Sequence, residues 1–222
     1  MIIYNPHNTQ ILKERIKLAE ELLNQIPVKY CFITGSFLYK EKYEDIDVFV
    51  ISRSKKKLER LRLENKKVKI TMIDFNDLYS LFYHSASKSC ISKNILPTKP
   101  LKVTISDYWH VVNEAIPVIL NQKNKFHKDA RFLVLYTEYF KANNILDTLQ
   151  LTQKINEFKN YEELLEYAKM EIPLIMNIKR KKSYIRRFFY SQAGFYKDML
   201  DYKAQKFLYE LTHLITRGIN HG

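Results

Sequence analysis

The feature of the sequence that most constrains the fold is a pair of short apolar segments joined by a polar loop. Residues 29–34 are rich in Tyr, Phe and Ile, and residues 45–52 become continuously apolar after Asp47, so each segment predicts a buried β-strand. Gly35-Ser36 directly follow the first strand, and Asp45-Ile46-Asp47 begin the second. Because side chains two positions apart leave the same face of a strand, we expect both aspartates on one face.

Helix and strand alternate through the rest of the first hundred residues. From Asn8 or Thr9, apolar residues recur at helical spacing until Pro27 closes the segment. Residues 68–75 alternate along the chain and predict a third strand. Asn76 is the predicted N-cap of a helix that follows this strand.

The second half of the chain has no convincing strand pattern. The segment 95–101 contains two prolines, which oppose both a helix and a central strand, so a domain boundary is predicted there. The predicted domains are residues 1–100 and residues 101–222. Helices are predicted in the second domain at about 107–122, 125–142, 148–158, 161–177 and 183–217.

The composition is that of a globular protein with a strong excess of positive charge. Of its 222 residues, 46% are hydrophobic, and the formal net charge is +13 at pH 7. Such an excess favours polyanionic partners, usually nucleic acid or nucleotides. A Lys-rich composition also follows from an AT-rich genome, so the charge supports contact with nucleic acid without establishing it.

The densest basic cluster lies in the second domain, where aromatic residues interleave with it. Its candidate nucleic-acid contacts are Lys179, Arg180, Lys181, Lys182, Arg186 and Arg187. In such a surface, basic side chains bind phosphates and neighbouring aromatic rings stack on bases. The alternative is a solvated helix face whose aromatic residues fill the core.

The sequence favours a cytoplasmic protein that does not enter a membrane. No apolar run approaches the ~20 residues that span a bilayer. The N-terminus lacks the basic start and the long apolar stretch of a signal peptide. Cys31 and Cys90 are far apart in the sequence, and Cys31 lies in an apolar strand, so a reduced setting is expected.

The Gly-Ser and Asp-Ile-Asp segments together suit the binding of a metal-bound triphosphate. A glycine at the end of a buried strand lets the backbone approach a phosphate, and the Ser36 hydroxyl adds a donor. Asp45 and Asp47 can hold one or two Mg²⁺ or Mn²⁺ ions, which in two-metal sites lie about 3.5–4 Å apart. A turn with two solvent-facing aspartates is the alternative, and it accounts for either segment alone better than for both at this spacing.

This layout resembles the polymerase β superfamily of nucleotidyltransferases, above all its minimal and kanamycin nucleotidyltransferase-like members. The resemblance rests on Gly35-Ser36 and Asp45-Ile46-Asp47 between apolar strands and covers roughly residues 10–100. It implies an α+β fold, in which a nucleotidyltransferase domain with a small mixed β-sheet precedes an all-helical C-terminal domain. It also implies that the two aspartates hold metal, that Gly35 and Ser36 bind phosphates of an NTP, and that Lys40 substitutes for a cation often found after the Gly-Ser.

The third strand departs from the family pattern. The family places there a third carboxylate, often the general base toward the acceptor, but the matching positions hold Lys69 or Thr71. Asp74 is the candidate base, although its opposite parity requires a bulge or an early strand end to turn it inward.

The predicted function is Mg²⁺-dependent transfer of a nucleoside monophosphate from an NTP to an acceptor. A nucleic acid or a protein is the favoured acceptor. The alternative is a catalytically degenerate relative that binds nucleotide, nucleic acid or a partner protein.

Overall fold

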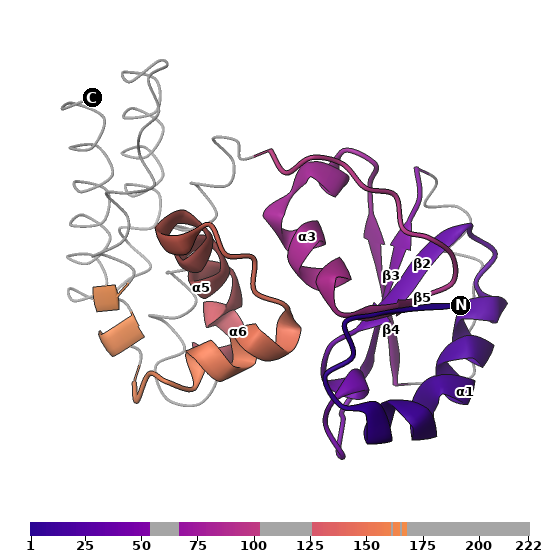
Figure 1. Cartoon of the computed structure of the whole chain (residues 1–222), viewed down its shortest axis with the longest axis horizontal. Helices are drawn as coiled ribbons and strands as arrows, with labels where there is room; N and C mark the ends of the chain where they lie inside the picture. The colour runs from indigo at the N-terminus through magenta and orange to yellow at the C-terminus, as the bar shows by residue number, and fades with distance from the viewer. Residues whose placement is uncertain (54–66, 103–125, 161, 165, 168–222) are drawn as a thin grey trace, which may run out of the picture. The chain divides into compact units, whose positions relative to one another are not determined.

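The computed structural model describes residues 1–53, 67–102, 126–160, 162–164 and 166–167. These residues form a mixed α+β architecture with a five-stranded mixed sheet and several helices (Figure 1). The elements in chain order are β1 (Ile2–Tyr4), α1 (Thr9–Gln25), β2 (Tyr30–Thr34), η1 (Ser36–Leu38), β3 (Ile46–Ile51), β4 (Val68–Ile73), η2 (Asp77–Tyr79), α3 (Leu81–Lys88), β5 (Cys90–Ser92), α5 (Phe126–Ala142) and α6 (Thr148–Ile155).

The sheet has the strand order β1-β5-β2-β3-β4. β2 pairs antiparallel with β3 and β5, and β1 pairs antiparallel with β5, whereas β3 and β4 are parallel. The three predicted strands are confirmed as β2, β3 and β4, although β3 begins only at Ile46 and β4 ends at Ile73. β1 and β5 have three residues each, which is too short for an alternating pattern to be recognised in the sequence.

Two buried clusters cover the two faces of the sheet. Residues of α1 share one cluster with Val48 and Val50 of β3, and residues of α3 share the other with Phe49 and Ile51. Alternate residues of β3 therefore enter opposite cores, which explains why the strand is apolar at nearly every position. Asp47 has the parity of Phe49, so its side chain leaves the sheet on the α3 side.

The predicted start of the first helix is confirmed, and one predicted cap is wrong. α1 begins at Thr9, and the Asn8 side chain caps it by accepting a hydrogen bond from the Ile11 N–H at 3.1 Å. Asn76 was predicted to cap the next helix, but this is wrong, because Asn76 has a helical backbone and its side chain makes no cap hydrogen bond. A short 3₁₀ turn intervenes, and the Ser80 side chain caps α3 by accepting from the Tyr83 N–H at 3.1 Å.

The chain divides into two compact units, and it returns to the first unit for a short segment before continuing in the second. The first unit comprises Met1–Lys102 and Leu146–Gln150, and the second comprises Val103–Ile145 and Leu151–Gly222. The predicted domains 1–100 and 101–222 remain a prediction. Within the first unit, the Ser85 hydroxyl donates to the Leu146 carbonyl at 2.5 Å.

Asp147 fixes the returning segment Leu146–Gln150 to the first unit. Its side chain lies 2.7 Å from the His7 ring nitrogen and is only 2% exposed. Its other oxygen accepts from the Leu149 and Gln150 N–H groups at 3.0 Å, and the Gln150 side chain accepts from the Asp147 N–H at 3.0 Å. This reciprocal capping box starts α6 at Thr148.

The helices predicted at about 125–142 and 148–158 are confirmed as α5 and α6. Residues 162–164 and 166–167 are helical, in line with the predicted helix at 161–177. The other predicted helices, at 107–122 and 183–217, lie outside the described residues. Of the helices that are described, none is both long enough and apolar enough to cross a bilayer.

Candidate functional site

Gly35 forms the turn at which β2 ends and the chain enters η1. Its backbone has φ 88° and ψ −164°, a conformation that L side chains rarely adopt. A Cβ atom at this position would lie 3.1 Å from the Asp47 carboxylate oxygen Oδ2. Both the backbone angle and the close carboxylate therefore require glycine, and the turn and Asp47 form one structural feature.

The strand register gives Asp47 a neighbouring residue on each side of β3. Thr34 is its partner on β2, and Lys69 is its partner on β4. The Thr34 hydroxyl donates to the Ser89 carbonyl at 2.9 Å and lies 3.4 Å from the Thr148 hydroxyl, so this end of the strand also meets the segment Leu146–Gln150.

Lys69 pairs with Asp45, which precedes β3. The Lys69 ammonium donates a hydrogen bond to the Asp45 carboxylate, and the side chains are 62% and 26% exposed. This hydrogen bond, followed by the charge of Asp45, raises the pKa of Lys69, and the charges of Asp47 and Glu44 add to the effect. Asp45, Asp47 and Lys69 thus form one cluster, which we call the Asp–Asp–Lys cluster.

Arg15 of α1 holds the loop that joins β2 to β3. Its guanidinium donates to the Phe37 carbonyl and, at 2.7 Å, to the Glu41 carbonyl. It also lies 4.6 Å from the ring centroid of Tyr43 and 5.3 Å from that of Phe37. These contacts fix the loop between Gly35 and Asp45 to a helix in the core.

The sequence analysis missed Arg15, although a signal was present. Arg15 lies four residues after Ile11 and four before Ala19, both buried positions of α1. A charged residue in the apolar stripe of a helix requires a specific partner. The loop carbonyls and the two rings are that partner.

Ser36 and Lys40 lie in the same loop as Gly35. Ser36 is partly buried, and its carbonyl accepts from the Lys40 N–H at 2.9 Å. The Leu38 N–H donates to the Gly35 carbonyl at 3.0 Å. These bonds close the turn, and the exposed Lys40 follows at its end.

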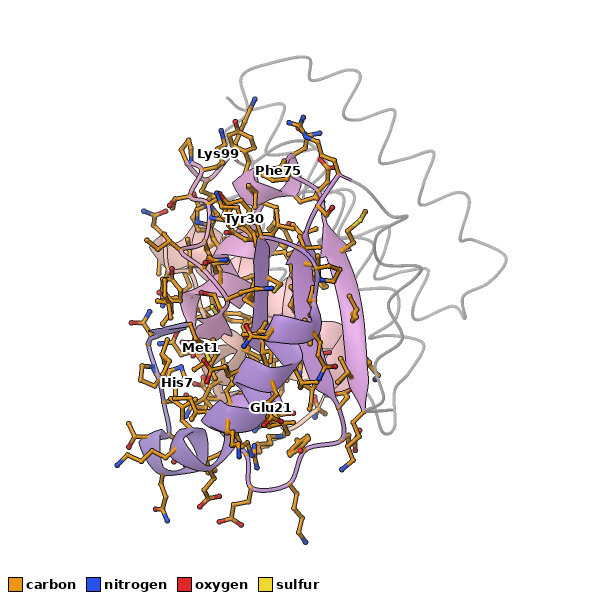
Figure 2. The ribbon with its side chains drawn as sticks, turned by 90° about the vertical axis from the view of Figure 1, so that its right-hand side faces the viewer. Met1, His7, Glu21, Tyr30, Phe75 and Lys99 are labelled. Atoms are coloured by element: carbon orange, nitrogen blue, oxygen red, sulfur yellow. The ribbon has the colours of Figure 1, made fainter. Side chains whose placement is uncertain are left out.

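The structure does not bring Asp74 to the Asp–Asp–Lys cluster. Asp47 is in register with Lys69, near the start of β4, whereas Asp74 follows the last residue of that strand. From Lys69 to Ile73 the strand rises about 13 Å at ~3.3 Å per residue. Phe75, next in sequence, packs against Tyr30 at the opposite end of β2, with ring centroids 6.5 Å apart (Figure 2).

Asp74 is engaged in a local turn. Its carboxylate accepts from the Asn76 N–H at 2.9 Å, and its own N–H donates to the Asp77 carboxylate at 2.9 Å. The strand ends early, as the prediction required, but the register keeps Asp74 at the wrong end of the sheet for a base acting beside Asp47. We therefore assign Asp74 to the turn.

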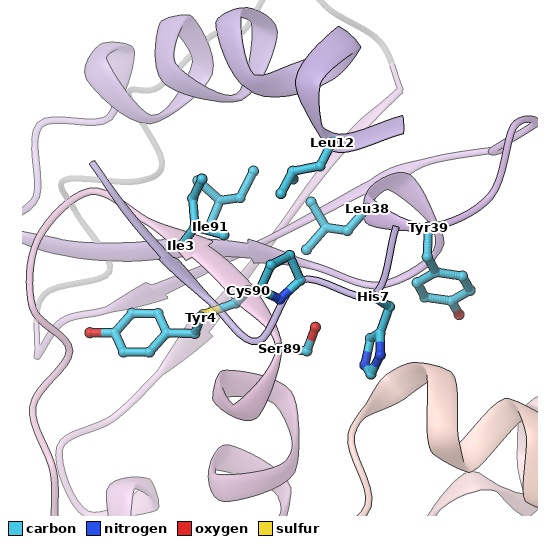
Figure 3. Close-up of a pocket in the computed structure, with 10 residues that line it drawn as sticks. Ile3, Tyr4, His7, Leu12, Leu38, Tyr39, Ser89, Cys90 and Ile91 are labelled. Carbon is cyan, nitrogen blue, oxygen red and sulfur yellow. The ribbon is translucent and has the colours of Figure 1, made fainter. Parts of the chain in front are cut away.

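A small cavity lies beside β1 and β5, where His7 and Tyr39 are among its lining residues (Figure 3). Its volume of about 10 Å³ gives room for about one water molecule, so it does not hold a nucleotide. Cys90 also lines it, and burial raises the pKa of the Cys90 thiol to about 12. Burial likewise raises the pKa of the Cys31 thiol to about 11, so both free cysteines are neutral thiols near pH 7.

Two further sequence predictions concern metal and nucleic acid. Across residues 1–53, 67–102 and the described part of the second half, no three His, Cys, Asp or Glu side chains come together as a metal site. The prediction that Asp45 and Asp47 hold a metal ion stays a prediction. The predicted nucleic-acid contacts Lys179, Arg180, Lys181, Lys182, Arg186 and Arg187 lie outside the described residues.

Comparison with known proteins adds no relative. No family model matches the chain, and neither a curated protein nor a solved structure matches it.

Proposed function

We propose that the chain is a polymerase β-type nucleotidyltransferase, which moves a nucleoside monophosphate from an NTP to an acceptor and releases pyrophosphate. The observation that carries the proposal is the approach of the Asp47 carboxylate to the Gly35 turn, 3.1 Å from the position of a Cβ atom. Transfer from a metal-bound triphosphate requires a metal ligand next to backbone that can approach a phosphate. Gly35 and Asp47 meet that requirement from neighbouring strands.

Asp45 and Asp47 are the residues that would hold Mg²⁺ or Mn²⁺. Carboxylate oxygens are the ligands these ions prefer. The fit rests mainly on Asp47, whose carboxylate lies beside the Gly35 turn, because the Lys69 ammonium on Asp45 competes with a metal ion. A bound Mg²⁺ supplies neutralisation of the charge that develops on the phosphates.

The remaining residues bind and position the substrate. Gly35 and Ser36 bind the β- and γ-phosphates through the backbone of the turn and the Ser36 hydroxyl. Lys40 is exposed at the end of the turn and provides a cation for the same phosphates. Arg15 positions the loop without touching substrate, and Asp74 has no part in the reaction.

The net charge favours one class of acceptor. A net charge of +13 favours nucleic acid, whose attacking group would be a terminal hydroxyl, and a protein hydroxyl fits the same reaction. This reaction suits a cytoplasmic protein, because NTP and Mg²⁺ are both present in the cytoplasm.

A second candidate function is nucleotide binding without transfer. Two observations favour it: Asp74 lies at the far end of β4, and Lys69 stands beside Asp47 where the resemblance leads one to expect a third acid. A protein of this kind keeps the Gly35 turn and the two aspartates for NTP·Mg²⁺ and lacks a base for the acceptor.

The test uses the full chain with each of the four α-³²P-labelled NTPs, Mg²⁺, and either total RNA or a protein extract. We expect label on one acceptor class, loss of labelling by at least about 100-fold in Asp47→Asn, and labelling within about threefold of wild type in Asp74→Asn. Both substitutions replace an aspartate by an asparagine, so they form a matched pair at opposite ends of the paired strands β3 and β4.

Three outcomes separate the candidates. Labelling that depends on Asp47 and not on Asp74 supports the transferase. NTP·Mg²⁺ binding that depends on Asp47, with no acceptor labelled, favours the second candidate. NTP binding that is unchanged in Asp47→Asn contradicts both.

A further inference from the structure

Lys69 brings a positive charge into the candidate metal site from the neighbouring strand. It is in parallel register with Asp47, and its ammonium reaches Asp45. Because Asp47 and Lys69 are in register, their side chains leave the sheet on the same side, and the ammonium reaches Asp45 just before the strand. The ammonium is therefore part of the Asp–Asp–Lys cluster, although the Lys69 side chain is largely exposed.

The charge of this cluster limits how many divalent ions it accepts. Two carboxylates and one ammonium sum to a formal charge of −1. A site with three carboxylates has a formal charge of −3, which is two units more negative. A bound triphosphate adds the same negative charge to either site, so an ammonium in place of the third carboxylate replaces the charge of one divalent ion.

We propose that the Lys69 ammonium takes the place of a second divalent cation, so that each chain with bound nucleotide holds one metal ion. The inference rests on the proposed function, since it concerns the metal at the same site. Lys69 is a specificity-determining residue in this arrangement: its ammonium supplies positive charge beside Asp45 and Asp47, the two residues that would hold the remaining ion.

The exposure of Lys69 is consistent with this role. The side chain is 62% exposed, so a bound triphosphate can approach the ammonium without displacing core residues. An ordinary lysine is charged at neutral pH, and Asp45, Asp47 and Glu44 raise the pKa of Lys69 further.

The test counts bound Mn²⁺ by equilibrium dialysis, with the full chain saturated in turn by the α,β-methylene analogue of each NTP. We expect one Mn²⁺ per complex in wild type and two in Lys69→Glu, because charge reversal creates a set of three carboxylates. Lys29→Glu is the matched control. Lys29 is an exposed lysine that precedes β2 at the opposite end of the sheet, and this variant should keep one ion.

Two outcomes overturn the proposal: two ions in wild type, or a single ion in Lys69→Glu. If Lys69→Glu does not fold, Lys69→Met provides the second measurement. Removing the repelling ammonium should tighten the binding of the single Mn²⁺ by about threefold, as for an exposed ion pair, and an unchanged Kd overturns the proposal. A wild-type chain that binds neither analogue nor Mn²⁺ instead overturns the proposed function, and the inference with it.

Discussion

The parallel strands β3 and β4 carry aspartates at both ends, and these aspartates have different hydrogen-bond partners. At one end, the contacts are with residues far away in the sequence. Asp45 pairs with Lys69 of β4, and Asp47 lies beside the Gly35 turn after β2. At the other end, Asp74 makes its hydrogen bonds within its own turn, to Asn76 and Asp77. Asp74 therefore stabilises its own turn, whereas Asp45 and Asp47 connect parts of the chain that are distant in the sequence.

Substitution of Gly35 should show the largest difference between the two ends. Gly35→Ala places a Cβ atom in a backbone conformation with positive φ, 3.1 Å from the Asp47 carboxylate. We expect unfolding to become easier by about 2 kcal/mol, and NTP binding to weaken with it. Chemical denaturation measures the first effect and equilibrium dialysis the second.

Asn76→Ala is the control at the other end. Asn76 has a right-handed helical backbone, which alanine adopts freely, so its effect should stay within about 0.5 kcal/mol. Equal destabilisation by the two variants would contradict the claim that the Gly35 turn requires glycine.

Arg15 and Arg53 offer a second matched pair. Arg15→Met loses two hydrogen bonds to the loop and contacts with the rings of Phe37 and Tyr43, so we expect a loss of about 1 kcal/mol. Arg53 lies 5.4 Å from the Phe75 ring centroid, and Arg53→Met should cost about 0.5 kcal/mol. Thermal or urea unfolding compares them. A lower NTP affinity in Arg15→Met alone supports a positioning role, and equal affinities refute it.

The smallest effect concerns the pH dependence of stability. The pKa of Lys69 is raised above its ordinary value of 10.5 in the folded chain, chiefly by the hydrogen bond to Asp45. The group therefore contributes stability that is fully present below pH 10.5 and is lost as the pH rises through the higher folded pKa. Unfolding of Lys69→Met should depend less on pH above 10 than unfolding of Lys29→Met. The same pH dependence in both variants would mean that the Asp45–Lys69 pair does not contribute.

The local features of the site could be predicted from the sequence because they depend on neighbours along the chain. Continuous apolar runs identified β2 and β3, alternation identified β4, and the Gly35-Ser36 and Asp45-Ile46-Asp47 segments marked the ends that meet. α1 begins within the predicted Asn8 or Thr9, since a helix start depends on residues only a few positions apart.

The remaining features depend on pairings that no local pattern contains. The parallel register of β3 and β4 decides that Lys69, and not Asp74, stands beside Asp47. The hydrogen bond from Arg15 to the Phe37 carbonyl joins residues more than twenty positions apart, and the pairing of His7 with Asp147 joins residues 140 apart. Alternation along a strand gives the face of each residue but leaves the register open.

The most direct test of the account is to map bound Mn²⁺ and nucleotide on the two ends of the paired strands β3 and β4. We would add Mn²⁺ and an α,β-methylene NTP to isotope-labelled protein and follow the amide NMR signals, which the paramagnetic ion broadens nearby. The account predicts that the signals of Gly35, Ser36 and Asp47 disappear while those of Asp74 and Asn76 persist. Broadening centred on Asp74, or no selective broadening at either end, would contradict it.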